Sequence, residues 1–183
     1  LYYAKNNIIV SLDQLISSSD VQVRIGMVIT LSSALSMSEM KKSDIVMRLA
    51  ILLIDPAESV RNLAAKCLEG AQARGIDTCA DSGTLALLLP SLTNGSFTAI
   101  LSPYLFSCIS KDEQQARIVL QLSDKTQIDQ NHKAVQELRK SCQEKIEGTL
   151  NEICTICKAL PRDALYTAEY EVPKELEKLE ILP

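Results

Sequence analysis

Apolar residues recur every three to four positions between residues 42 and 75, which is the spacing of an amphipathic helix. The run is interrupted once, at Asp55-Pro56, and a residue that precedes proline is pushed out of the helical region. The pattern therefore predicts one helix over residues 42–54 and a second that begins at Pro56 or Ala57 and ends at Gly75. The apolar positions that define the two helices are Ile45, Leu49, Leu52 and Leu53, then Val60, Leu63, Ala64, Cys67, Leu68 and Ala71.

The same pattern occurs once before, displaced by 37 residues. Val23-Arg24 aligns with Val60-Arg61, and apolar residues align with apolar residues along both helices. We therefore expect two repeat units, residues 5–38 and 42–75, each made of two antiparallel helices. A helix pair of this size cannot bury its apolar face alone, so such units stack on their neighbours.

Beyond Gly75 the pattern weakens, and we expect degenerate units over residues 83–124. Within them we expect a helix at 85–92 interrupted by Pro90, a helix at 96–109 bent near Pro103, and another at 110–124. Apolar residues with a mean gap of about 3.6 then predict one long helix over residues 128–160. Residues 161–183 follow as an acidic C-terminal tail, with six acidic and three basic residues.

Asp55, Val60 and Arg61, placed in a turn and at the start of a second helix, resemble the signature of a HEAT repeat. The first unit resembles it less closely, because Ser18 stands where an aspartate is expected. The resemblance extends over residues 5–75.

This resemblance implies an all-α fold, a right-handed α-solenoid of stacked antiparallel helix pairs over residues 1–160. In that family, aspartates and arginines of successive repeats form a hydrogen-bonded ladder inside the stack. The resemblance thus implies that Arg24, Asp55 and Arg61 have a structural role.

Charge and cysteine usage limit the partners and the compartment. The formal net charge is −4, so a basic surface for nucleic acid is not expected. No segment approaches the 18 or more apolar residues of a membrane span. Several of the six cysteines fall at apolar helical positions, where free cysteine behaves as a small hydrophobic residue. This favours a reducing compartment, the cytoplasm or the nucleus.

Two features could carry chemistry, and the sequence favours a structural role for both. Cys154 and Cys157 form a CxxC motif near the C-terminal end of the long helix, where the helix dipole disfavours a thiolate, and a second pair of zinc ligands is missing. His132 is the single histidine, and no glycine-rich phosphate loop or hydrolase motif accompanies it. We expect no catalytic residue, no cofactor and no metal site.

The pattern favours a non-enzymatic module (a scaffold, an adaptor or an assembly subunit) that binds another protein through the inner face formed by its second helices. A regulatory cofactor of a chaperone, transport or nucleotide-cycling machine is the alternative. An enzyme that acts on nucleic acid is a third reading, which the low aromatic content and net acidity disfavour.

The expected contact residues lie on the second helices, outside their apolar stripes: Ile25, Ile29, Asn62, Lys66 and Glu69. Ile25 and Ile29 stand one helical turn apart, so they form an apolar ridge where the second unit has polar residues. The ridge either packs against a preceding repeat or the N-terminal segment, or is an exposed anchor for a partner. Exposed apolar patches tend to mark interaction sites, and we therefore favour contact with the partner.

Overall fold

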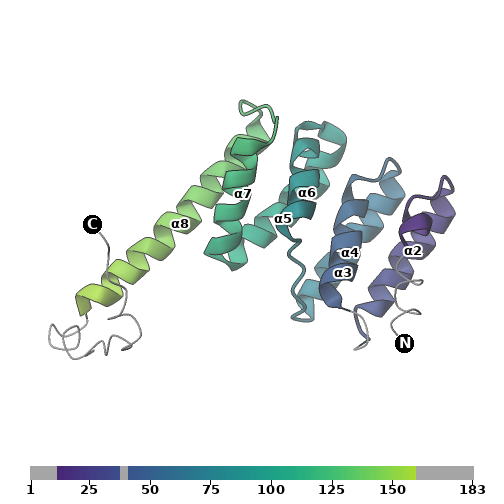
Figure 1. Cartoon of the computed structure of the whole chain (residues 1–183), viewed down its shortest axis with the longest axis horizontal. Coiled ribbons are helices and arrows are strands. Elements are labelled where there is room, and N and C mark those ends of the chain that lie inside the picture. The colour runs from purple at the N-terminus through teal and green to yellow at the C-terminus, as the bar shows by residue number, and fades with distance from the viewer. Residues whose placement is uncertain (1–11, 38–40, 160–183) are drawn as a thin grey trace, which may run out of the picture. The chain divides into compact units, whose positions relative to one another are not determined.

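The computed structural model describes residues 12–37 and 41–159, and the side chains of α8 up to residue 155. Those residues form helices and connecting turns without a strand, which confirms the all-α prediction (Figure 1). The start of the helix predicted from residue 5, the acidic tail predicted for residues 161–183 and the side chain of Cys157 lie outside the described residues.

The first helix pair consists of residues 12–16, which are helical, and α2 (Val21–Ala34). Asp20 caps α2, because its carboxylate accepts a hydrogen bond from the backbone N–H of Gln22 at 2.8 Å. Met27 and Leu31 are buried on the core side of α2.

The second pair follows the sequence prediction closely. It contains α3 (Lys42–Ile51), the 3₁₀ helix η1 (Leu52–Ile54) and α4 (Glu58–Ala73), with Asp55 ending the first helix. Gly75 has a φ of 75°, and the N–H groups of Gly75 and Ile76 bond to the carbonyls of Gln72 and Ala71. This is the Schellman pattern, which needs the left-handed conformation that glycine adopts without strain.

Two further pairs follow. The third contains α5 (Ser82–Leu88), the 3₁₀ helix η2 (Leu89–Thr93) and α6 (Gly95–Lys111). The fourth contains α7 (Glu113–Lys125) and α8 (Lys133–Ala159). Pro90 lies at the start of η2 and Pro103 lies inside α6, as the sequence indicated.

The long helix begins later than predicted, at Lys133 instead of residue 128. Thr126 closes α7 by donating its N–H to the Leu122 carbonyl. The Asp129 carboxylate accepts the N–H of Asn131 at 2.9 Å, which holds this segment in a turn. Ile128 is nevertheless buried. It belongs to the apolar pattern because the turn packs against the core, and not because residue 128 is helical.

The 37-residue period continues through the segments that we expected to be degenerate. Helices α2, α4 and α6 begin at Val21, Glu58 and Gly95, each 37 residues after the one before. Two series of buried residues at the same spacing run through α2, α4, α6 and α8: Met27, Ala64, Leu101 and Leu138, and Leu31, Leu68, Leu105 and Cys142. The second helices of all four pairs thus use equivalent positions for the core.

The principal helix contacts lie within a pair or join one pair to the next. Helix α2 packs on α3 and α4, α3 packs on α4, α4 packs on α6, and α6 packs on α7; α5 packs on α3 and α7 (Figure 1). The chain divides into compact units of residues 1–146 and 147–183, so the division falls inside α8. None of the helices in the described part of the chain combines the length and the apolarity that crossing a bilayer requires.

Candidate functional site

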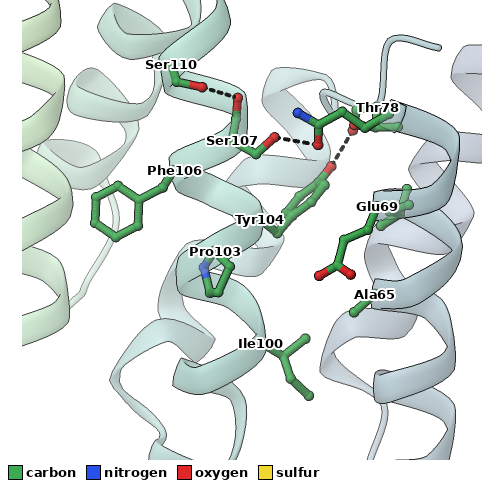
Figure 2. A pocket seen from close by; sticks show the side chains of 11 residues that line it. Ala65, Glu69, Thr78, Ile100, Pro103, Tyr104, Phe106, Ser107 and Ser110 are labelled. Carbon is green, nitrogen blue, oxygen red and sulfur yellow. Dashed lines mark hydrogen bonds between the residues drawn. The ribbon is translucent and has the colours of Figure 1, made fainter. Parts of the chain in front are cut away.

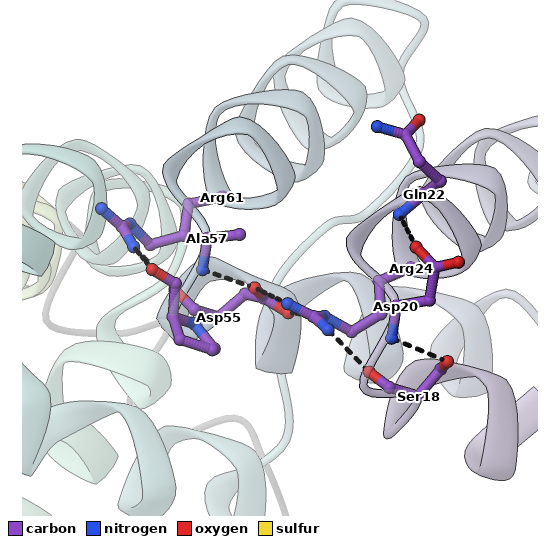
Figure 3. Close-up of polar contacts among 8 residues, drawn as sticks. Ser18, Asp20, Gln22, Arg24, Asp55, Ala57 and Arg61 are labelled. Carbon is purple, nitrogen blue, oxygen red and sulfur yellow. Dashed lines mark hydrogen bonds and ion pairs between the residues drawn. The ribbon is translucent and has the colours of Figure 1, made fainter.

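Arg24, in the first turn of α2, joins the first helix pair to the second. Its Nε and Nη2 atoms donate to the two carboxylate oxygens of Asp55 at 2.7 and 3.0 Å, and its Nη1 atom donates to the Ser18 carbonyl at 2.6 Å (Figure 3). Both side chains of this pair are buried. The hydrogen bond to Asp55 is the main cause that raises the pKa of Arg24 above its usual value. This bidentate geometry fixes the distance between the two turns.

Arg61 occupies the equivalent position on α4 but has different partners. Its Nη1 atom donates to the carbonyls of Asp55 and Pro56 at 2.7 and 2.9 Å. Its guanidinium lies 5.0 Å from the centre of the Phe97 ring, and its buried Nε has no hydrogen-bond partner among the described residues. Among the residues that the structure describes, no carboxylate pairs with Arg61, because residue 92, 37 positions after Asp55, is a leucine. The arginine–aspartate link therefore stops after one step.

The third pair keeps part of this arrangement with a different residue. The Thr98 hydroxyl donates to the Leu92 carbonyl at 2.8 Å. Arg24 and Arg61 make the same bond to the carbonyl six residues earlier, and the three donors are 37 residues apart. Thr98 thus replaces the arginine at the third turn.

A second buried arginine, Arg48, also links the first two pairs. Its Nε and Nη2 atoms bond to the carboxylate of Asp13 at 2.8 and 3.2 Å. Sequence reasoning did not single it out, because neither residue belongs to the repeated Val-Arg motif. A buried arginine on the core side of α3 was the available signal, since such a residue needs a partner.

The predicted contact residues do not form one uniform surface. Ile29 is 54% exposed on α2, and Asn62, Lys66 and Glu69 are exposed on α4. Ile25, however, is half-buried and packs against the core, so the expected two-residue ridge is reduced to Ile29.

A groove of about 490 Å³ lies between α4 and α6 and includes Glu69 in its wall. In Figure 2, Ile100, Tyr104 and Ser107 point from α6 towards α4, and Glu69 extends into the space between the helices. Pro103 also lines it, as does Phe106, which points away from Glu69 in this view. The α6 residues were missed from sequence, although a shift of 37 residues carries Lys66 onto Pro103 and Glu69 onto Phe106.

Hydrogen bonds fix one end of the groove. The Ser107 hydroxyl donates to Gln72 Oε1 at 2.8 Å, and the Tyr104 hydroxyl donates to the Thr78 carbonyl at 2.9 Å (Figure 2). Burial is the main cause that raises the pKa of Tyr104 above its usual value, so the phenol stays neutral. The end of the groove near Thr78 is therefore a fixed surface.

The groups considered for catalysis are not assembled into a site by the described residues. His132 is half-buried, and its Nδ1 has no hydrogen-bond partner. Cys67, Cys79, Cys108, Cys142 and Cys154 are unpaired thiols in the described part of the chain, and burial raises the pKa of Cys142 to about 11. Within that part, no group of three or more His, Cys, Asp or Glu residues is placed to hold a metal ion.

The chain matches no protein-family model and no curated protein sequence.

Proposed function

We propose that this protein is a non-enzymatic binding module, a right-handed HEAT-like solenoid that holds another protein against the second helices of its pairs. In this role it acts as a scaffold, an adaptor or a subunit of a larger assembly. The surface extends from Ile29 on α2 to the groove between α4 and α6.

The groove is the observation that carries the proposal. It lies between two neighbouring second helices, and its lining combines apolar side chains with one carboxylate, that of Glu69. Ile29, Lys66 and Pro103 occupy equivalent positions on successive second helices, and all three are exposed. A series of exposed positions at one repeat spacing is the kind of extended surface through which helical repeats bind proteins.

The lining indicates the chemistry of the partner segment. An apolar side chain of the partner fits between Ala65 and Ile100, and a lysine or arginine beside it meets the carboxylate of Glu69. The chain's net charge of −4 also favours a basic protein segment over the phosphate backbone of a nucleic acid.

Ile29→Asp tests the proposed face. The partner is first identified by proximity labelling around the full chain, then purified and titrated against the variants. We expect Ile29→Asp to weaken binding more than about tenfold, or roughly 1.4 kcal/mol, because it places a charge in an apolar contact. The melting temperature should move little, since Ile29 is exposed.

Leu87→Asp is the matched control, because Leu87 is 60% exposed on α5, a first helix of its pair. It should leave the affinity unchanged. If Leu87→Asp weakens binding and Ile29→Asp does not, the partner uses the other face. If Ile29→Asp unfolds the chain, Ile29 belongs to the core.

A further inference from the structure

Cys79 and Cys108 are neighbours, although 28 residues lie between them in the sequence. Cys79 lies in the segment between α4 and α5, and Cys108 lies in the last turns of α6. The Cys79 thiol donates to the Cys108 carbonyl with Sγ and O 3.9 Å apart. The Cys79 sulfur therefore lies against the backbone of Cys108.

The two cysteines differ in their exposure to solvent. Cys108 is buried, whereas Cys79 is half-buried and lines a pocket of about 280 Å³ together with Lys111 and Gln115. A small reagent that enters this pocket meets the Cys79 sulfur first.

The surroundings shift the pKa values of the two thiols in opposite directions. The hydrogen bond from the Cys79 thiol is the main cause that lowers the pKa of Cys108, followed among the favourable causes by the Ala80 N–H and with help from the Lys111 ammonium. The pKa of Cys79 is raised, chiefly because its proton is held in that same bond. The C-terminal end of α6 acts against a thiolate here, and these donors oppose its effect.

Lys111 and Asp77 keep the segment and the helix end together. The Lys111 ammonium lies 3.0 Å from the Asp77 carboxylate, which also accepts the Cys79 N–H at 3.1 Å. These contacts hold the Cys79 segment against the C-terminal end of α6, where Cys108 lies.

We propose that Cys79 and Cys108 form a dithiol site that a low-molecular-weight disulfide oxidises to an intramolecular disulfide. The inference is independent of the proposed binding function. It assigns Cys79 as the attacking thiol and Cys108 as the resolving thiol.

The reaction balances as two successive thiol–disulfide exchanges. Cys79 loses its proton to a hydroxide ion of the solvent, and the Cys79 sulfur attacks one sulfur of the reagent. The reagent's S–S bond breaks, a Cys79 mixed disulfide forms, and the first small thiolate leaves and takes a proton from water. Cys108 then loses its proton to a hydroxide ion, attacks the Cys79 sulfur and displaces the second small thiolate, which takes a proton from water. Two protein thiols are oxidised and one disulfide is reduced to two thiols.

Hydroxyethyl disulfide is the probe for the test. The folded full chain is incubated with it, free thiols are blocked with N-ethylmaleimide before unfolding, and the products are mapped by mass spectrometry. We expect loss of the mass of two hydrogen atoms without a retained adduct, and a peptide that joins Cys79 to Cys108. Cys108→Ser should stop at the mixed disulfide on Cys79.

Cys67→Ser is the matched control, because Cys67 is a half-buried thiol on α4 outside the pair. It should oxidise as the parent chain does. The proposal is overturned if the parent chain stops at a mixed disulfide, if it joins other cysteines, or if it does not react. The parent chain is mapped directly, so these outcomes decide the matter even if Cys108→Ser does not fold.

Discussion

Arg24 and Arg61 occupy the same repeat position but contribute differently to the free energy of unfolding. Arg24 neutralises a carboxylate that is buried between two helix pairs. Arg61 bonds to carbonyls of its own turn and lies over the Phe97 ring. Removing Arg24 leaves a buried charge unpaired, whereas removing Arg61 leaves only neutral acceptors with fewer bonds. The free energies of unfolding of the two variants should therefore differ.

We expect Arg24→Ala to lower the free energy of unfolding by about 3–5 kcal/mol, because it strands the Asp55 carboxylate in the interior. Arg61→Ala should lower it by about 1–3 kcal/mol. Urea denaturation of the purified variants measures both values.

Arg74→Ala provides the reference for these two variants, since Arg74 is exposed at the end of α4, and its effect should stay within about 0.5 kcal/mol. Equal losses for Arg24→Ala and Arg61→Ala would show that Asp55 does not depend on Arg24.

At the scale of helices, the sequence predicted the helix ends that depend on local backbone preferences. It did not predict the repeat units in which another residue replaces the arginine. Asp55-Pro56 and Gly75 act through their own backbone preferences, so the ends of the second pair could be predicted. Residues 83–124 were judged degenerate because they lack the aspartate and Val-Arg signature, and Thr98 stands where the first two pairs have arginine. Their apolar positions continue, but a leucine or cysteine in a helix is too common to mark a repeat by itself.

The candidate site shows the same limit. Glu69 could be picked out as an exposed polar position on a second helix, but the groove needs α6 to lie beside α4. That neighbour relation is a tertiary fact, and a short window of sequence does not contain it. The partial burial of Ile25 is also a tertiary feature, because it depends on how closely the adjacent helices approach α2.

Two glycines in similar open space should respond to alanine in opposite ways. Gly26 lies inside α2 and Gly75 follows α4, and a Cβ added to either meets no atom within 4 Å. Gly26→Ala should stabilise the chain by about 0.5–1 kcal/mol, because alanine is the better helix former. Gly75→Ala should destabilise it by about 1–2 kcal/mol, because Gly75 has a φ of 75°.

Thermal or urea unfolding of both glycine variants measures the two changes. A stabilising Gly75→Ala would mean that the turn after α4 does not use the left-handed conformation in solution.

At the scale of the whole molecule, the main contacts among the described helices connect each helix pair with the next. Because most of these contacts join neighbouring pairs, the loss of one contact need not lower the stability of all helices equally. Arg24→Ala should therefore act mainly on the first two pairs.

Native-state hydrogen exchange checks this expectation. In Arg24→Ala, amide protection in α2 should fall more than amide protection in α6, which is not among the principal contacts of α2. The same fall in both helices would show that the chain unfolds as one cooperative unit.

The separation of Arg24 from Asp55 also has a consequence during synthesis. The two residues are 31 positions apart, and at about 5–20 residues per second a ribosome needs roughly 2 to 6 seconds to add that length. During this interval the Arg24 guanidinium of the first helix pair has no Asp55 carboxylate to bind. The nascent first pair therefore keeps this guanidinium hydrated until the turn of the second pair emerges, and only then can the two pairs pack against each other.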